Sequence, residues 1–110
     1  MPSIADRVLA VELKTKTVAV PEWGVDIGLR EMDAAQRVKF GEDAKKIPAL
    51  ALVRLIISCA FDPATGAAAF EPAHQDALLK KSGAVIDRLA TEICDLSGLT
   101  DKAATEAEKN

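Results

Sequence analysis

The residues that could take part in catalysis are few in this 110-residue chain, and they lie far apart in the sequence. There is one histidine, His74, there are two cysteines, Cys59 and Cys94, and there is no tyrosine. Nucleophilic catalysis needs a nucleophile, a base and a third group that orients the base. No such set follows from the spacing, so we predict that the protein is not an enzyme and that His74 has a structural or solvent-exposed role.

We also predict no metal, cofactor or phosphate site. Cys59 and Cys94 belong to no C-x-x-C motif and fall in apolar helical patterns, which favours buried small hydrophobic residues over a disulfide or a metal site. Ser82 follows two lysines but lacks the glycine-rich frame of a phosphate-binding loop, so a helix N-cap is the better interpretation.

Charge and hydropathy exclude two classes of partner. The chain carries 14 Lys and Arg against 17 Asp and Glu, a net charge of −3, whereas a nucleic-acid binder needs a basic surface. The longest apolar run is shorter than the roughly 20 residues of a membrane span and contains Arg54. The N-terminus lacks a basic region followed by an apolar core, so we expect no secretory signal and a cytoplasmic location.

The most apolar run, from Ile47 to Phe61, is predicted to be a central core helix. Pro48 suits the first helical turn, and Asp62-Pro63 ends the run because proline disfavours helical dihedral angles in the preceding residue. Large apolar residues occur around nearly the whole circumference, which indicates a helix covered on most sides. They are Leu50, Leu52, Val53, Leu55, Ile56 and Ile57.

A β-hairpin is predicted at about residues 13–30. A segment rich in threonine and valine and a segment that alternates apolar with polar or small residues flank Pro21-Glu22-Trp23-Gly24, whose proline and glycine suit a turn. Val25, Ile27 and Leu29 share one face, which must pack on the helices or on another molecule because a lone hairpin is marginally stable. Trp23 at the turn either closes the core over the hairpin or is an exposed anchor for a partner.

Two helices before the central one are predicted from capping boxes, Ser3 with Asp6 and Asp33 with Gln36. The first is a two-turn helix through residue 10, and the second is expected to stop near Gly41. Their inward sides are expected to be Ile4, Val8 and Leu9 in the first helix, and Ala34, Val38 and Phe40 in the second.

Two further helices follow the central one, after a turn at residues 62–66. One occupies residues 71–79 with Pro72 in its first turn, and a longer amphipathic helix begins at Ser82 and ends at Gly98 in a left-handed cap. The predicted fold class is therefore α+β, mostly α: a small helical domain around a central apolar helix with one N-terminal β-hairpin. We expect a single domain over residues 1–99 and a polar C-terminal tail over residues 100–110.

Several short motifs occur in an order and at spacings that resemble the tail assembly chaperones of long-tailed bacteriophages. They span most of the chain, although the turn at residues 64–69 is less acidic than in that family. The motifs are Leu13-Lys14-Thr15, Val18-Ala19-Val20-Pro21-Glu22-Trp23-Gly24, Leu29-Arg30-Glu31-Met32-Asp33-Ala34-Ala35-Gln36-Arg37, Lys80-Lys81-Ser82, Val85-Ile86-Asp87-Arg88-Leu89, Leu96-Ser97-Gly98-Leu99 and the final Glu108-Lys109-Asn110.

The resemblance implies a non-enzymatic function in the cytoplasm of an infected or lysogenic bacterial host. Such a chaperone keeps the tape measure protein, a long helical polymer with exposed apolar stripes, soluble while the tail tube polymerises, and it is absent from the mature virion. The resemblance also implies a homo-oligomer and a longer frameshifted form that recruits the tail tube protein, with this chain as the short form or first domain. The alternative is a small structural or adaptor subunit that is retained in the tail.

The partner-binding surface that we predict is the hairpin, with Trp23, Val25, Ile27 and Leu29, together with the exposed flanks of the amphipathic helices. A binder for an apolar helical client needs an apolar groove or edge and weak repeated contacts. The sequence does not choose between the client and a second copy of the chain as the occupant of the hairpin edge.

Overall fold

The computed structural model describes residues 2–99, so the predicted tail at residues 100–110 lies outside the described residues. The chain is α+β and mostly helical, with an N-terminal hairpin joined by a third short strand, which confirms the predicted fold class. The division into a domain and a tail stays a prediction.

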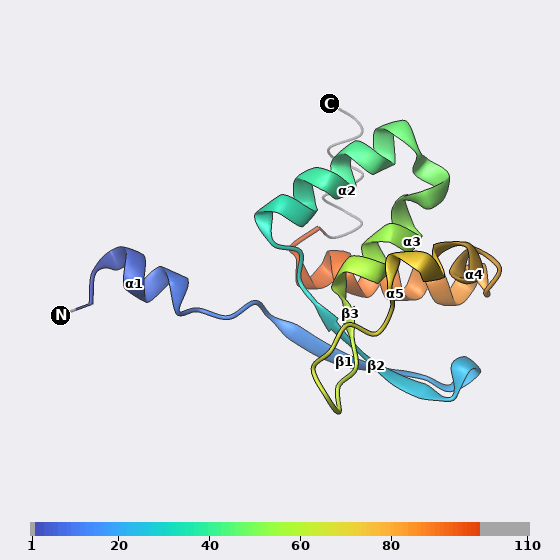
Figure 1. The fold of residues 1–110 in the computed structure, drawn as a ribbon, viewed down its shortest axis with the longest axis horizontal. Helices are drawn as coiled ribbons and strands as arrows, with labels where there is room; N and C mark the ends of the chain where they lie inside the picture. Colours follow the sequence, from blue (N-terminus) through green and yellow to red (C-terminus); the bar gives the residue numbers. More distant parts are fainter. Residues whose placement is uncertain (1, 100–110) are drawn as a thin grey trace.

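Figure 1 shows the sheet lying beneath a layer of helices. The helices are α1 (Ile4–Leu9), α2 (Ala34–Lys46), α3 (Pro48–Cys59), α4 (Gln75–Leu79) and α5 (Gly83–Leu96), with short 3-10 helices η1 (Pro21–Trp23) and η2 (Pro72–His74).

The predicted hairpin is formed by strands β1 (Thr15–Val20) and β2 (Val25–Arg30). They pair antiparallel from Val20 opposite Val25 to Thr15 opposite Arg30. The four-residue connection works because η1 turns the chain and Gly24 adopts a φ of 68°, a left-handed conformation that glycine reaches without a steric penalty.

A third strand, β3 (Ala60–Phe61), extends the sheet to the order β1-β2-β3. The central helix was expected to continue to Phe61, and this boundary is wrong, because the helix ends at Cys59. Phe61 pairs with Gly28 and places its ring over that glycine, where any side chain would overlap the ring. The guanidinium carbon of Arg30 lies 4.8 Å from the centre of the same ring. This packing and the ladder pairing stabilise the two residues as strand rather than helix.

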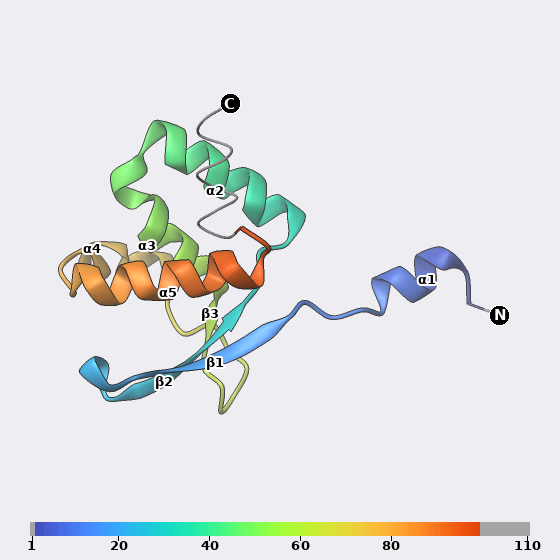
Figure 2. The ribbon, with the colours of Figure 1, turned by 180° about the vertical axis from the view of Figure 1, so that it is seen from behind.

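Helix α3 occupies the centre of the helical layer and contacts α2, α4 and α5 (Figures 1 and 2). Its buried residues are Ala51, Val53, Leu55, Ile56 and Cys59. Helix α5 places one apolar stripe in the same core, in which Val85, Ile86, Leu89 and Ile93 are buried and Leu96 is partly buried. Gly98 follows α5 with a φ of 81°, and the Leu99 N–H donates to the Cys94 carbonyl at 2.7 Å, so the predicted left-handed cap is confirmed.

Helix α2 is longer than the sequence predicts and is rotated about its axis. Its capping box forms as predicted, but the helix continues past Gly41 to Lys46, where two lysines in the last turn interact favourably with the helix dipole. The predicted inward residue Val38 is 64% exposed, whereas Asp43 is buried. Ala34 is exposed as well, so Phe40 is the one predicted inward residue that does lie inward. The inner face of α2 consists of Gln36, Phe40 and Asp43, at spacings of four and three residues.

Helix α1 forms at its predicted position, but its predicted inward side is wrong. The Ser3 hydroxyl accepts from the Asp6 N–H at 3.1 Å, and the Ser3 N–H donates to the Asp6 carboxylate at 3.3 Å. No residue of this helix is buried, and the helix projects away from the rest of the chain beyond the Thr15 end of β1 (Figures 1 and 2).

Candidate partner-binding surface

The predicted apolar face of the hairpin is buried at one end and exposed at the other. The exposed fraction rises along β2 from 0% at Leu29 through 4% at Ile27 to 50% at Val25. Trp23 is half-buried and packs against the edge of the core. Leu29 therefore stabilises the fold of the monomer, and the part of the predicted surface that a partner can reach directly is Trp23 and Val25.

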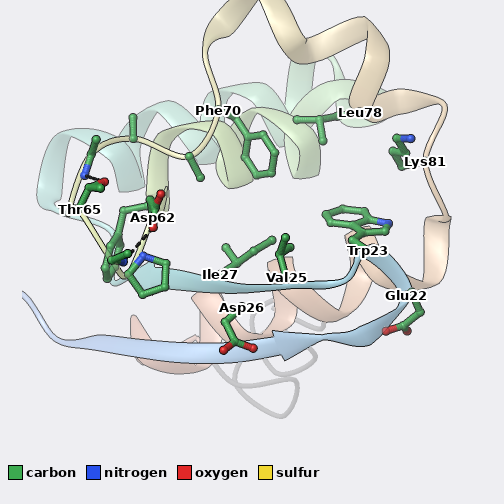
Figure 3. Close-up of a pocket in the computed structure, with 16 residues that line it drawn as sticks. Glu22, Trp23, Val25, Asp26, Ile27, Asp62, Thr65, Phe70, Leu78 and Lys81 are labelled. Atoms are coloured by element: carbon green, nitrogen blue, oxygen red, sulfur yellow. Dashed lines mark hydrogen bonds between the residues drawn. The ribbon is translucent and has the colours of Figure 1, made fainter.

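Trp23 and Val25 lie in an elongated groove between the hairpin and the helices, with a volume of about 790 Å³, which we call the hairpin groove. Figure 3 shows Val25 and Ile27 on the β2 side, facing Phe70 and Leu78 on the opposite side. Trp23 closes one end of the groove. Its walls are apolar side chains from three separate parts of the chain, which suits the apolar face of a peptide or helix.

Charged groups occur at the two ends of the hairpin groove. At one end Lys81 lies above Trp23, and at the other Asp62 lies in the turn after β3 (Figure 3). The Asp62 carboxylate accepts from the Ala64 N–H at 2.8 Å, which holds this turn. Asp26 also borders the groove, but its side chain extends to the side of β2 opposite Phe70. The polar ends can fix the orientation of an apolar segment that binds between them.

An exposed ion pair fixes the hairpin turn on the helical layer. Arg88 of α5 donates to both carboxylate oxygens of Glu22, at 2.8 and 3.0 Å. These hydrogen bonds, followed by the backbone hydrogen bond of Glu22, lower the pKa of Glu22 from 4.5 to about 2. Because Glu22 directly precedes Trp23, the pair positions the tryptophan at the end of the groove.

The Glu22 carboxyl is expected to titrate near pH 2 in the folded protein, measured by NMR. A pKa lowered on folding stabilises the folded state above about pH 4.5, and this contribution is lost as the pH falls from 4.5 to about 2. Arg88→Ala should return the Glu22 pKa toward 4.5, whereas Arg37→Ala, which removes a cation from α2, should not. A Glu22 pKa near 4.5 in the parent would mean that the pair does not form in solution.

A smaller groove of about 370 Å³ lies between α2 and α3 and contains a buried carboxylate that was not predicted from the sequence. Asp43 is 4% exposed and lies 3.4 Å from the Lys39 ammonium and 3.5 Å from the Arg54 guanidinium. Arg54 also donates to the Gln75 side chain at 3.0 Å, which connects α2, α3 and α4. Buried charges are stable only when paired, so this cluster has a structural role. The i, i+4 spacing of Lys39 and Asp43 is the sequence pattern that could have indicated this ion pair.

The chemistry-bearing residues lie apart in the fold. The His74 Nδ1 accepts from the Glu71 N–H at 2.9 Å, so this histidine caps η2. Cys59 is 2% exposed, and burial raises the pKa of its thiol. Cys94 is half-buried and packs against the core from α5. Among residues 2–99 there is no group of three His, Cys, Asp or Glu side chains that could hold a metal ion, and no helix is long and apolar enough to cross a membrane.

Comparison with known proteins gives an informative similarity to a solved structure. No family model matches the chain, and no curated protein matches it. A solved structure, described as the bacteriophage HK97 tail assembly chaperone, matches with a TM-score of 0.64 and 27% sequence identity. The match covers 84% of this chain and 91% of that one. The predicted resemblance is therefore confirmed: in fold and in sequence, this chain is similar to a phage tail assembly chaperone.

Proposed function

We propose that the protein is a phage tail assembly chaperone that binds the tape measure protein, keeps it soluble while the tail tube assembles, and is absent from the mature virion. The observation that carries this proposal is the similarity to the HK97 tail assembly chaperone over 84% of the chain. In this role the protein acts in the host cytoplasm and associates with further copies of itself. A longer frameshifted form contacts the tail tube protein.

The hairpin groove is the proposed site for the client. A long helical protein with apolar stripes presents short amphipathic segments, and the groove offers apolar walls to one such segment. Trp23 and Val25 make the direct contacts, Ile27 lines the base of the groove, and Leu29 supports the strand from the core. Each contact is weak, but several copies on one client gain affinity through effective concentration.

Co-expression with the tape measure protein of the same phage tests the proposed function. We expect the tape measure protein to stay in the supernatant after centrifugation and to co-purify with this chain, and to precipitate without it. Mass spectrometry of mature virions should detect no copies of the chain. A tape measure protein that precipitates regardless, together with stoichiometric copies in the virion, would favour the alternative of a structural or adaptor subunit.

Trp23→Ala is expected to weaken client binding more than it lowers stability. Truncating an aromatic anchor in a groove typically weakens binding about tenfold or more. Trp23 is only partly buried, and the Glu22–Arg88 pair still holds the turn, so the melting temperature should fall by no more than about 4–8 °C, equivalent to roughly 1 kcal/mol.

The matched control for Trp23→Ala is Val38→Ala, whose side chain is exposed on α2 outside the groove. It should change neither client retention nor the melting temperature. Unchanged client retention by Trp23→Ala with a large fall in melting temperature would assign Trp23 to closing the core.

A further inference from the structure

The two ends of the hairpin groove carry opposite single charges. Asp62 lies in the turn after β3 at one end, and Lys81 lies beside Trp23 at the other (Figure 3). Both residues are exposed. Neither forms an ion pair with any residue in the described range 2–99, so both charges are available to a ligand.

The other two charged residues that line the groove are acidic and are directed away from a ligand. The Glu22 carboxylate accepts from Arg88 at 2.8 and 3.0 Å, and the Asp26 side chain extends away on the other side of β2 (Figure 3). The Asp62 carboxylate accepts from the Ala64 N–H through one oxygen, and a carboxylate has further acceptor positions for a cation. A ligand in the groove therefore meets a carboxylate at one end and an ammonium group at the other.

Between the two charges the groove is apolar and matches a short helix in length. Val25 and Ile27 on β2 face Phe70 and Leu78 (Figure 3). The strand from Val25 to Gly28 spans about 10 Å at roughly 3.4 Å per residue, and the two charges lie beyond its ends. A helix rises about 1.5 Å per residue, so a segment with about seven to eleven residues between its own charges fits the groove.

We propose that the hairpin groove selects, within the tape measure protein, a helical segment with a lysine or arginine at one end and an aspartate or glutamate two to three turns away. The cation lies beside Asp62, the carboxylate lies beside Lys81, and an apolar stripe lies between Val25 and Phe70. In the reverse orientation each charge of the segment would meet a like charge, so the groove favours one orientation. This selection rests on the proposed function, because the groove must first be the client site.

Three synthetic peptides test the selection. Each is an amphipathic helix of about four turns with the same apolar stripe and no tryptophan, and the end charges are lysine and glutamate, two lysines, or two glutamates. Trp23 is the only tryptophan of the chain, so its fluorescence reports binding in the groove. At low salt the parent should bind the lysine–glutamate peptide about threefold more tightly than the other two, the effect of one exposed ion pair. Equal dissociation constants for the three peptides would overturn the proposal.

Charge reversal in the groove should change the preferred peptide. Asp62→Lys should bind the peptide with two glutamates best, and Lys81→Glu the peptide with two lysines. Glu42→Lys and Lys80→Glu are the matched controls, since they make the same charge changes at exposed positions outside the groove and should keep the parental preference. If the reversal at Asp62 disturbs its turn, as judged by melting temperature, Asp62→Asn keeps an acceptor for the Ala64 N–H and should bind the lysine–glutamate and two-glutamate peptides equally. Groove variants that keep the parental preference would contradict the selection.

A spin label tests the orientation of the bound segment. A nitroxide quenches tryptophan fluorescence at short range, and Trp23 lies at the Lys81 end of the groove (Figure 3). On the lysine–glutamate peptide, a nitroxide at the glutamate end should quench Trp23 more than the same label at the lysine end. The order should reverse in a chain that carries both Asp62→Lys and Lys81→Glu. Equal quenching from the two ends would mean that the charges do not orient the segment.

Retention of the tape measure protein separates this proposal from the proposed function. Asp62→Lys and Lys81→Glu should each keep less tape measure protein in the supernatant than their matched controls. If the parent keeps the tape measure protein soluble but binds the three peptides equally, the proposed function stands and the selection by charge is wrong. If the tape measure protein precipitates with the parent although the peptides bind as expected, the groove selects by charge and the tape measure protein is not its client.

Discussion

Ile56→Ala is expected to lower the free energy of unfolding by about 2–5 kcal/mol, the usual range for truncating a large buried aliphatic side chain. Ile56 is 0% exposed and lies on α3, the helix that contacts α2, α4 and α5. The truncation leaves a cavity at the centre of the core that three neighbouring helices cannot all move to fill. Urea unfolding monitored by circular dichroism measures the change.

Val38→Ala serves as the control for Ile56→Ala, because Val38 is 64% exposed and should change stability by less than about 0.5 kcal/mol. Equal stability losses in the two variants would mean that α3 is not the centre of the core. Since Ile56 lies outside the hairpin groove, any loss of client binding by this variant should parallel its unfolding.

Gly28→Ala is expected to destabilise the protein by about 1–3 kcal/mol, the typical cost of overpacking. Replacing a strand glycine by alanine normally stabilises by about 0.4–1 kcal/mol, so the sign of the effect is informative. At Gly28 a methyl group would overlap the Phe61 ring, which must then leave its position beneath the Arg30 guanidinium. This displacement also disturbs the pairing of β3, the strand that leads into the groove turn.

A double-mutant cycle with Phe61→Ala isolates the clash between Gly28 and the ring. In the Phe61→Ala background the cost of Gly28→Ala should vanish or become a small gain in stability. An equal cost in both backgrounds would show that the strand tolerates alanine poorly for a reason other than the ring.

Local signals predicted most elements because the interactions that specify them are local. The two capping boxes, the Pro21–Gly24 turn, the stripe of α5 and its Gly98 cap each depend on residues within one or two turns of one another. The orientation of α2 depends instead on contacts with another helix, because the inner face of α2 contains two polar residues, Gln36 and Asp43. Gln36 donates to the Ser58 carbonyl at 3.0 Å, and Asp43 pairs with Arg54. Both partners, Ser58 and Arg54, lie on α3. Apolar periodicity therefore favoured Val38, which has no such partner.

The end of the central helix and the hairpin groove depend on contacts between distant residues. Ala60 and Phe61 continue the apolar run of α3 without a break, and only the pairing with Gly28 and Leu29 makes them a strand. The groove combines the hairpin turn, the chain after β3 and α4, which a single sequence does not bring together. For the same reason the alternation of Val25, Ile27 and Leu29 predicted a shared face but not its gradient from exposed to buried.

Hydrogen–deuterium exchange of the chain, alone and in complex with the tape measure protein, tests most directly whether the hairpin groove holds the client. We expect slower exchange in the complex at residues 22–27 and 62–70, which line the groove, and unchanged exchange on the outer side of α2. Protection confined to α2 or α5, with none at the hairpin turn, would contradict the assignment of the groove as the client site.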